Sequence, residues 1–497
     1  MTLVSRALIA FACALAAGAA AAQAPRSALP DRRLDPPPLP APIADGAVAL
    51  TPVDGPAPEA PRGVALSMRL NAVAFRGVNP DGDGARLLEA PGFREAVDAA
   101  RGEIVDFPRI EGLRRSLNEA LVSGGFISSS VRLAEIDLDQ GLDIFDVAVG
   151  RLTALNVVGE GVAAGADARD LGDLSADYIR ARLATDSEVF SLPETEEALR
   201  VLIRDRNVER VTAAVRPGAA PGETVLEVET AARRPYDLAA TIANDTPDGI
   251  GEETLTLSGA ARNIATSGDQ LAFEARLSEG RRAIALEADA PLWPGGPAPF
   301  LAFEHARAEF VVGDFAALDV ESRFTRFGFG LRLPLLETSS RRLTSVLAFD
   351  LKRTRSTLLD EPFSFSAGVQ NGRTRLSVLS LAQEFVDIAE DRTLALRAEA
   401  NLGLPILSAT RNPGDAPDGE FFTLVGQMQV AQRLAPEVTL IGRVQGQYAS
   451  RALLPIEQVA IGGRETVRGF GESALTGDEA LTGSLEARIA LFDAPAP

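Results

Sequence analysis

Arg468 is the side chain whose surroundings most favour a specific interaction. Glycine adopts backbone conformations that are closed to other residues, so the glycine after Arg468 allows a tight turn between the cation and an aromatic ring. A guanidinium group donates strong, charge-assisted hydrogen bonds. This stretch therefore predicts an arginine presented at a loop tip for binding. The residues of this loop motif are Gly462, Gly463, Val467, Arg468, Gly469 and Phe470.

Catalytic and metal-binding chemistry finds no support in the sequence. There is no Gly-x-x-x-x-Gly-Lys phosphate loop and no Gly-x-Ser-x-Gly elbow, and Gly328-Phe329-Gly330 lacks the third glycine of a dinucleotide fingerprint. The chain has one histidine, His305, and one cysteine, Cys13, which excludes a metal site built from these residue types. We therefore expect neither an enzyme nor a bound cofactor, and we expect His305 to be a lumen or interface residue.

The loop motif lies in the connection 450–480, which is far longer than a hairpin between two strands requires. Connections of this length are usually functional or disordered. The segments on both sides of it alternate strictly between apolar and polar residues, so that one face suits lipid and the other suits water. We interpret 450–480 as a loop folded into a membrane barrel. The apolar residues of the two flanking segments are Val438, Leu440, Val444, Tyr448, Leu481, Leu485, Ile489 and Leu491.

The chain from Tyr236 onward consists of similar alternating segments separated by Gly, Pro, Asp and Asn. A soluble β-sandwich would also bury one apolar face. A signal peptide, many similar strands in succession and charged residues on the other face favour the membrane barrel instead. The 12 predicted strands are 236–243, 253–263, 269–278, 282–290, 300–312, 318–333, 343–354, 373–386, 391–403, 421–434, 438–449 and 481–492.

Charged residues that alternate with apolar ones on these strands are expected to face a wet lumen. The segment 391–403 is the clearest case, because leucine and alanine alternate there with charged and polar side chains. We also expect Arg353 to face the lumen. The lumen-lining candidates are Arg397, Glu399, Arg443, Glu486 and Arg488.

Composition and the N-terminal region narrow the class of protein. A chain of 497 residues predicts two or three domains, and a net charge of -20 argues against a nucleic-acid partner. Residues 1–22 predict a secretory signal peptide that contains Cys13, and the proline-rich residues 23–65 predict an extended linker. No later run of 18 apolar residues appears, so a membrane span has to be built from strands.

Two units of similar order precede the barrel segments. Either unit, by spacing alone, fits any small α+β binding module. Residues 66–150 predict a strand at 69–76, helices at 93–100 and 109–123, and strands at 127–134 and 142–149. Residues 151–232 repeat this order, with a strand at 152–158, helices at 176–183 and 193–206, and strands at 208–215 and 224–229.

The loop motif resembles the sixth-extracellular-loop signature of the two-partner secretion outer-membrane transporters, the hemolysin secretion/activation proteins. Gly124-Gly125-Phe126-Ile127 and the order of the two units resemble the POTRA pair of that family. The resemblance implies a mixed fold class, α+β and all-β: two tandem POTRA domains, 66–150 and 151–232, followed by an antiparallel transmembrane β-barrel, 235–497. It also implies that the loop 450–480 folds into the barrel, where Arg468 meets an acidic residue of the inner wall.

The resemblance further implies the function. The barrel would lie in the outer membrane of a Gram-negative bacterium, with the POTRA domains in the periplasm. These domains would bind an unfolded hemolysin- or adhesin-type exoprotein, and the barrel would export it to the cell surface, with or without activating it. The partners would be the exoprotein and outer-membrane lipid, and the chain would act as a monomer. Two alternatives stay open: an insertase that folds other barrels, and a passive porin.

The sequence departs from the family pattern in two places. The family's barrel has sixteen strands, and a later strand normally carries the acidic partner of the loop arginine, whereas 12 strands are predicted here. The chain is either a shortened product or a barrel that closes with 12 strands, and we favour the former because an unpaired edge in lipid is costly. Family members often carry a pore-plugging helix near the N-terminus, but the prolines of 23–65 leave little room for one.

Overall fold

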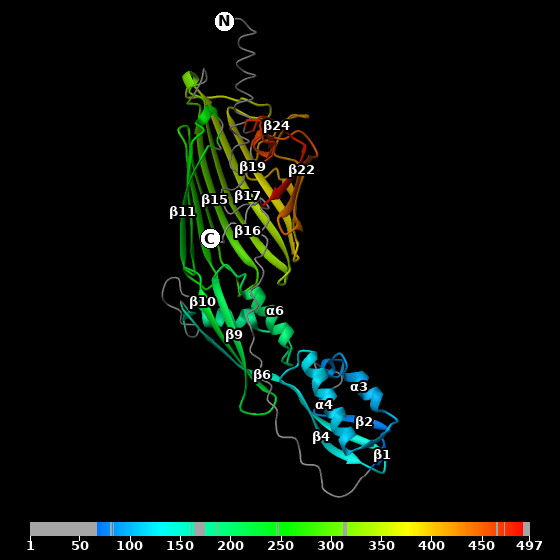
Figure 1. Ribbon diagram of the computed structural model, residues 1–497. Coiled ribbons are helices and arrows are strands. Elements are labelled where there is room, and N and C mark those ends of the chain that lie inside the picture. The colour runs from blue at the N-terminus through cyan, green and yellow to red at the C-terminus, as the bar shows by residue number, and fades with distance from the viewer. Residues whose placement is uncertain are drawn as a thin grey trace. The chain divides into compact units, whose positions relative to one another are not determined.

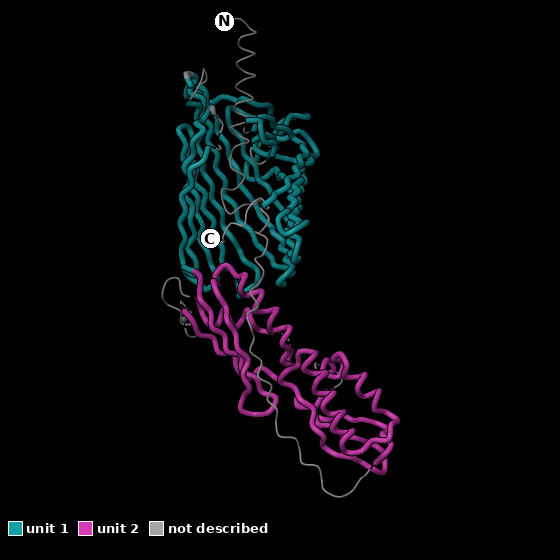
Figure 2. Tube along the Cα trace, in the orientation of Figure 1, with its two compact units in different colours: residues 1–43, 170–172, 234–497 teal, residues 44–169, 173–233 magenta. Residues whose placement is uncertain are grey.

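The computed structural model forms two compact units, which are described separately (Figure 2). Among the described residues, one unit covers 67–233 and the other begins at Arg234. The predicted signal peptide, the proline-rich linker and the end of the last predicted strand lie outside the described residues. The structure describes residues 67–490 except positions 80, 81, 83, 161, 164–173, 186, 245, 247, 312–315, 464, 465 and 472.

The first module of the smaller unit is a three-stranded sheet covered by helices. Its strands run in the order β2-β5-β4, with β2 parallel and β4 antiparallel to the central β5. The helix α4 begins where the Asp106 side chain accepts a hydrogen bond from the Arg109 backbone N–H at 2.9 Å, a typical N-cap. The elements are β1 (Ser67–Arg69), β2 (Ala72–Arg76), α2 (Ala85–Leu88), α3 (Phe93–Ala100), β3 (Ile104–Asp106), α4 (Phe107–Ser123), β4 (Ser130–Asp137) and β5 (Leu142–Ala148).

The second module repeats this arrangement. Its sheet has the order β6-β10-β9. The central strand β10 is parallel to β6 and antiparallel to β9. The predicted helices and long strands of both modules are present, while β1, β3, α2, β7 and β8 were missed because they are too short for periodicity to show. The elements are β6 (Arg151–Val158), β7 (Val162–Ala163), β8 (Leu174–Ser175), α5 (Ala176–Leu183), α6 (Leu192–Leu202), β9 (Val208–Pro217) and β10 (Glu223–Ala232).

The segment before α6 fastens the second module to the first. Val189 is buried in the hydrophobic core of the first module. The backbone N–H groups of Phe190 and Leu192 donate to the carbonyls of Gly150 and Gly125 at 2.8 and 2.9 Å. The two modules are therefore joined by shared core packing and by main-chain hydrogen bonds.

The main part of the larger unit is an antiparallel sheet in which each long strand pairs with the next long strand along the chain, curved around a common interior (Figure 1). The 12 predicted strands are all present, and a short β18 (Glu361–Pro362) pairs with β17. They are β11 (Tyr236–Ala243), β12 (Thr254–Arg262), β13 (Gln270–Leu277), β14 (Arg281–Asp289), β15 (Ala298–Glu309), β16 (Glu321–Glu337), β17 (Arg341–Leu358), β19 (Arg373–Ile388), β20 (Arg392–Gly403), β21 (Phe422–Ala435), β22 (Val438–Ala449) and β25 (Ala480–Ile489).

The first and last strands of this sheet do not pair with each other. Within the described residues, β11 pairs only with β12, and β25 pairs only with β22. Leu238 on β11 and Leu481 on β25 are 75% and 77% exposed, more than the apolar residues of the inner strands. Closure between these two strands, which was the less favoured of the two expectations, is thus not seen in the described part of the chain.

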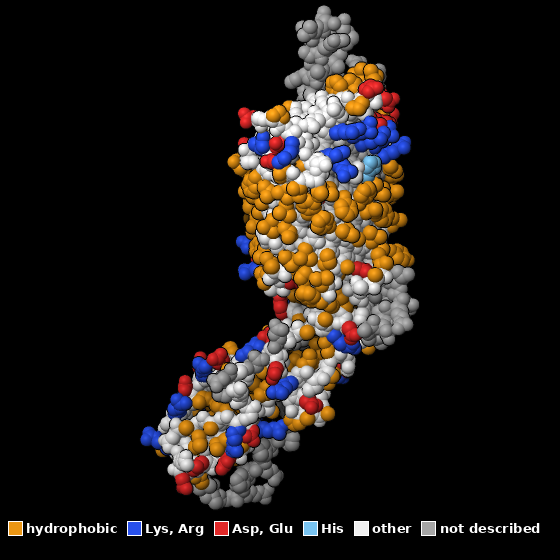
Figure 3. All heavy atoms as spheres, turned by 180° about the vertical axis from the view of Figure 1, so that it is seen from behind, with side chains coloured by type: hydrophobic (Ala, Val, Ile, Leu, Met, Phe, Trp, Pro, Cys, Tyr) orange, Lys and Arg blue, Asp and Glu red, His pale blue; other side chains and the backbone are white. Residues whose placement is uncertain are grey.

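The two faces of the sheet differ as the alternation predicts. On β15, Ala302 and Glu304 are buried, while Leu301 and Phe303, which alternate with them, are exposed. On the face seen in Figure 3, exposed apolar side chains form a band across the barrel. A charged interior with an apolar exterior is the reverse of a soluble sandwich and confirms the predicted membrane barrel. No helix in the described part of the chain is long and apolar enough to cross a membrane.

Candidate functional site

The first part of the loop 450–480 lies against the inner wall of the barrel. Leu453 and Leu454 pack with Leu376, which belongs to the inward face of β19. Ile456 packs against a cluster on β14, β15 and β16 that includes Phe324. The loop contains the short helix η3 (Pro455–Glu457) and a small hairpin of β23 (Val459–Ile461) with β24 (Leu475–Gly477). The chain after β22 therefore reaches strands far from it along the sheet.

Buried polar contacts hold this part of the loop in place. The Lys352 ammonium on β17 donates to Glu457 Oε1 at 2.6 Å, and both side chains are largely buried. Gln447 Nε2 on β22 donates to the backbone carbonyls of Glu457 and Asp478 at 2.9 and 3.0 Å. The Asp478 carboxylate accepts from the Gln458 side chain at 2.9 Å. Sequence reasoning assigned no role to these residues, because the wall partner is far away along the chain.

The glycines of the loop motif adopt the backbone conformation that only glycine takes easily. The φ angles of Gly462, Gly463 and Gly469 are +117°, +91° and +92°. The Gly462 N–H donates to Thr466 Oγ1 at 2.7 Å, and the Gly463 N–H donates to the Phe470 carbonyl at 3.2 Å, which closes a compact turn. Val467 and Phe470 are both exposed, so the turn presents its side chains outward from the hairpin.

Arg468 at this turn meets an acidic residue of the wall. Its Nη2 lies 3.0 Å from Glu486 Oε2 on β25. Arg488 Nε donates to the other carboxylate oxygen at 2.7 Å, and Arg443 Nη1 lies 3.9 Å from Glu486 Oε2. Glu486 alternates with the exposed Leu485, so it faces inward. The alternating pattern predicts that Arg443, Glu486 and Arg488 face the lumen. It does not indicate that Glu486 is the partner of Arg468.

The other two lumen candidates form a separate group. The Arg397 guanidinium on β20 contacts Glu384 on β19, and its Nε donates to Glu399 Oε2 at 3.2 Å. Arg397 is almost fully buried. No contact among the described residues joins this group to Arg468. The cation is held between two carboxylates of the wall, which is an arrangement suited to stiffening the wall.

The prediction that Arg353 faces the lumen was wrong. Arg353 lies opposite Thr325 and Arg375, on the outward face that also carries the exposed Leu347. The alternating pattern of β17 has charged residues on both faces near one end, so the pattern alone did not distinguish them. His305 likewise lies on the outward face, where its Nδ1 is 3.0 Å from Thr325 Oγ1.

A buried charged group on β15 to β17 was not singled out from the sequence. Arg326 Nε donates to Asp350 Oδ1 at 2.8 Å, and both side chains are buried. Glu304 beside them is also buried, and neither of its carboxylate oxygens has a hydrogen-bond partner among the described residues. The described residues contain no cluster of His, Cys, Asp and Glu that fits a metal ion.

Comparison with solved structures supports the fold. CdiB from Escherichia coli superposes with a TM-score of 0.64 at 16% identity, over 88% of this chain and 79% of that chain. CdiB from Acinetobacter baumannii gives a TM-score of 0.58 at 15% identity, over 90% of this chain and 81% of that chain. At this level of identity the likeness concerns the fold alone.

Comparison of sequences identifies the family. The outer membrane transporter CdiB of Dickeya dadantii (strain 3937) is 24% identical over 381 residues, which are 74% of this chain. The matched part is 64% of that relative's length, so the chain spans just under two thirds of it. The family model described as haemolysin secretion/activation protein ShlB/FhaC/HecB matches residues 222–486. This match covers more than half of the chain, and the chain therefore belongs to the ShlB/FhaC/HecB family of haemolysin secretion/activation proteins.

Proposed function

We propose that the chain is a two-partner secretion transporter that exports a large hemolysin- or adhesin-type exoprotein. The barrel lies in the outer membrane, and the two α+β modules lie in the periplasm. In this proposal residues 66–150 and 151–232 are POTRA domains that bind the exoprotein while it is unfolded, and 235–497 forms the conducting barrel. The transporter acts as a monomer in contact with outer-membrane lipid, and it has no catalytic activity or cofactor.

The observation that carries the proposal is the loop held inside the barrel. Glu457 is tied to Lys352 on one part of the wall, and Arg468 is tied to Glu486 on another. The first contact is buried, whereas Arg468 is 63% exposed and sits in a cluster of three arginines around one carboxylate. A solvent-exposed ion pair holds weakly. The Arg468 end of the loop is therefore the part that can be displaced when an exported chain enters.

The two modules offer sheet edges for binding an extended chain. In the second module β9 pairs only with β10 among the described strands, so its other edge is open. In the first module β4 pairs only with β5 and has the same property. An unfolded segment that adds a strand to such an edge gains main-chain hydrogen bonds without needing a fixed sequence. This mode of binding suits a transporter that handles one long exoprotein segment by segment.

The direct test is to look for a large secreted protein encoded beside this gene and to measure its export. Cells that make both proteins are expected to release the exoprotein, and cells without the transporter are expected to retain it in the periplasm. Purified residues 66–232 are expected to bind the denatured exoprotein but not its folded form. Pore conductance without any such binding would favour a passive porin and contradict the proposal. A defect in other outer-membrane barrels when the gene is deleted, with normal export, would favour an insertase.

A further inference from the structure

Five arginines form a continuous row across the outer wall of the barrel. Cross-strand register places Arg282 opposite Arg307, Arg307 opposite Arg323, Arg323 opposite Arg355, and Arg355 opposite Arg373. These residues come from five neighbouring strands, β14 to β19 along the main path of the sheet. One position further along the outward face, Arg353 lies opposite Arg375. We call these seven residues the arginine belt: Arg282, Arg307, Arg323, Arg353, Arg355, Arg373 and Arg375.

The arginine belt borders the apolar band on the outside of the barrel. All seven side chains are exposed. Leu351 precedes Arg353 by two residues on β17 and lies opposite Phe327 on β16. The Phe327 side chain is 46% exposed. Figure 3 shows basic side chains gathered at one end of the barrel, directly beside the hydrophobic band. The belt therefore lies where a bilayer passes from hydrocarbon to headgroups.

Nearby carboxylates of the protein neutralise only part of the positive charge of the arginine belt. Arg307 Nη2 lies 2.8 Å from Glu321 Oε2 and 3.3 Å from Glu309 Oε2, and Arg323 also contacts Glu321. The other five arginines form no ion pair with any residue in the described ranges. Seven cations against two carboxylates leave an excess of five positive charges (7 - 2 = 5).

Such a row is unfavourable without an external anion. Directly opposed side chains of an antiparallel sheet lie about 5 Å apart, and like charges at such positions destabilise the pairing. At the other end of the same strands the outward Arg341 instead has an acidic partner, because its Nε lies 3.0 Å from Asp387 Oδ1, and the same carboxylate also pairs with Arg392. Five of the seven belt arginines lack even one such partner among the described residues. This contrast indicates a partner at that end that supplies negative charge.

The direction of the strands assigns this end to the cell surface. The chain leaves the second module and enters the barrel at Tyr236, so β11 begins at the periplasmic end. Successive antiparallel strands then place the start of β14, β16 and β19, and the end of β15 and β17, at the opposite end. All belt residues lie near those strand ends. This step rests on the proposed orientation, with the two modules in the periplasm.

The belt covers only one sector of the wall. On β13 the residue opposite Arg282 is Leu277, so the row stops there. Neighbouring strands are about 4.8 Å apart, which gives the five-strand row a width of roughly 20 Å. A single phosphate is much smaller than this width, so the sector fits an amphiphile with several anionic groups, or a few such molecules side by side.

We propose that the arginine belt binds the phosphate groups of the phosphorylated glycolipid of the outer leaflet, lipopolysaccharide. Guanidinium groups bind phosphate oxygens in a two-pronged geometry, which makes arginine well suited to this contact. The acyl chains of the same lipid would cover the apolar residues next to the belt, such as Phe327 and Phe329, which are exposed on the outer face. One lipid would thereby bind the arginine row with its phosphates and cover the adjoining apolar band with its acyl chains.

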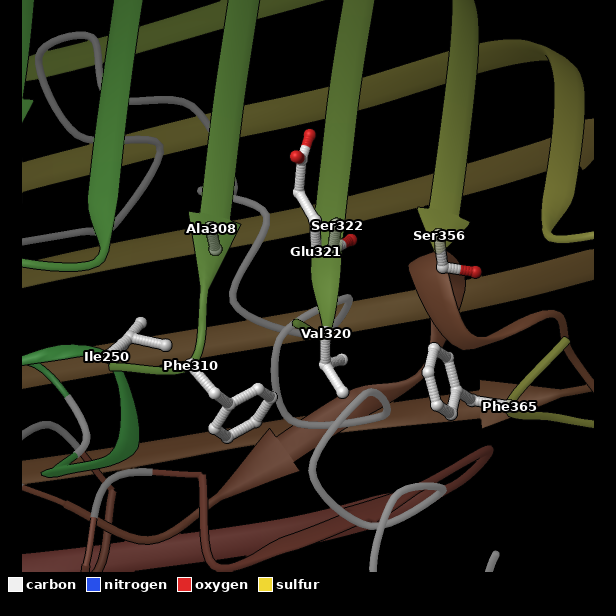
Figure 4. Close-up of a pocket in the computed structure, with 8 residues that line it drawn as sticks. All are labelled: Ile250, Ala308, Phe310, Val320, Glu321, Ser322, Ser356 and Phe365. Atoms are coloured by element: carbon white, nitrogen blue, oxygen red, sulfur yellow. The ribbon is translucent and has the colours of Figure 1, made fainter. Parts of the chain in front are cut away.

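A pocket near the belt does not provide an alternative anion site. Phe310, Val320 and Phe365 line it, as Figure 4 shows, and they pack together in one hydrophobic cluster. The only charged side chain in its lining is Glu321. An anion would be repelled there, so the open wall is the binding surface.

The test is lipid binding by the purified full chain in nanodiscs. The probes are lipid A with both phosphates and the same lipid after enzymatic dephosphorylation, each measured by native mass spectrometry. The variant R323Q/R355Q/R373Q removes three positions of the row. Each arginine near a charged lipid surface contributes about fivefold in affinity, so we expect the triple variant to bind diphosphorylated lipid A roughly ten- to hundredfold more weakly. Binding of the dephosphorylated lipid should be equal in both proteins.

Two further variants keep the test decisive. R76Q/R94Q/R101Q removes the same charge from exposed arginines of the first module and should bind like the wild type. R323K/R355K/R373K keeps the charge but loses the two-pronged contact, so its affinity should fall between the wild type and the glutamine variant. Equal affinity of wild type and glutamine variant would overturn the proposal, as would equally tight binding of phosphatidylglycerol nanodiscs. No exoprotein is present, so failure here leaves the export proposal untouched.

Discussion

The contact between Arg468 and Glu486 is the residue pair on which the proposed mechanism depends. Arg468→Ala removes one of three arginines around Glu486 and frees the tip of the loop. Because Arg488 and Arg443 remain, the wall itself should stay intact. We expect the variant barrel to reach the membrane at normal levels and export to fall several-fold, the scale on which one screened ion pair shifts a loop equilibrium. Immunoblots of medium and membranes measure both quantities.

The control for this variant is another loop arginine. Arg411→Ala breaks an exposed 2.8 Å pair with Glu420 in the connection between β20 and β21, and export should not change. Glu486→Gln should lower export at least as much as Arg468→Ala, because it also removes the contacts to Arg443 and Arg488, and the double variant should be no worse than Glu486→Gln alone. Normal export by Arg468→Ala, or additive losses in the double variant, would contradict the assigned pair.

Asp143 makes the stability of the first module depend on pH. This side chain on β5 is fully buried, and neither carboxylate oxygen has a hydrogen-bond partner among the described residues. Burial raises the pKa of Asp143 from 3.8 to about 6. The folded state therefore holds this proton more tightly than the unfolded state. The contribution of Asp143 to stability is therefore neutral below pH 4, becomes unfavourable as the pH rises from about 4 to 6, and stays unfavourable above that window.

Asp143→Asn should remove this dependence, because the amide carries no charge at any pH. We expect the variant of residues 66–232 to gain about 1 to 3 kcal/mol over the wild type at pH 8 and almost nothing at pH 4. Urea unfolding at the two pH values measures the difference. A variant that gains as much at pH 4 as at pH 8 would show that ionisation of Asp143 is not the cause.

At the scale of single residues, the sequence indicated residue types and faces but not partners. The left-handed backbone of Gly469 followed from its place between a cation and an aromatic ring, and its φ angle is +92°. The pairing of Arg468 with Glu486 could not be foreseen, because it depends on how far the loop descends along β25. Arg353 was misplaced because a strand end that projects beyond the hydrocarbon no longer has to keep charges on its inner face.

At the scale of elements, the junction between the two modules depends on one glycine. Gly125 follows α4 with a φ of +84°, and a Cβ atom there would lie 2.4 Å from Cδ of Pro193 at the start of α6. Gly125→Ala should therefore cost about 2 kcal/mol or more, from backbone strain and from the forced separation of the modules. Thermal unfolding of residues 66–232 measures this loss.

A glycine inside α4 provides the matched control. Gly112 lies inside the helix, and a Cβ atom there would meet nothing within 4 Å. Gly112→Ala should raise stability by roughly 0.5 to 1 kcal/mol, because alanine is the better helix former. If both substitutions stabilise the fragment, Gly125 does not determine the junction.

The long elements were predictable because periodicity becomes visible over several turns or pleats. The helices α3 (Phe93–Ala100) and α5 (Ala176–Leu183) match their predicted ranges to the residue, and the barrel strands differ from prediction mostly by a few residues at each end. The short pairs β1 with β3 and β7 with β8 carry no such signal. The packing of Val189 into the first module's core could not be predicted either, because the sequence of a connection does not show which of its valines is buried.

At the scale of the whole molecule, the number and order of barrel strands followed from the sequence, whereas the pairing at the two sheet edges did not. An open edge exposes backbone N–H and C=O groups that cost several kcal/mol each in hydrocarbon. Edges left unpaired at β11 and β25 would therefore be unfavourable in hydrocarbon. Alternation predicts which face of a strand meets lipid, but it holds no information about which strands meet each other.

The central claim is that the exoprotein passes through the barrel interior. The most direct measurement is crosslinking of an exoprotein arrested in transit by a tightly folded fusion domain. Two neighbouring positions on β22 form a matched pair: Gln445 faces inward, while Val444 faces outward and is 41% exposed. Gln445→Cys is expected to crosslink to the arrested exoprotein, whereas Val444→Cys is not. Equal crosslinking at both positions, or none at Gln445→Cys while export proceeds, would contradict the claim.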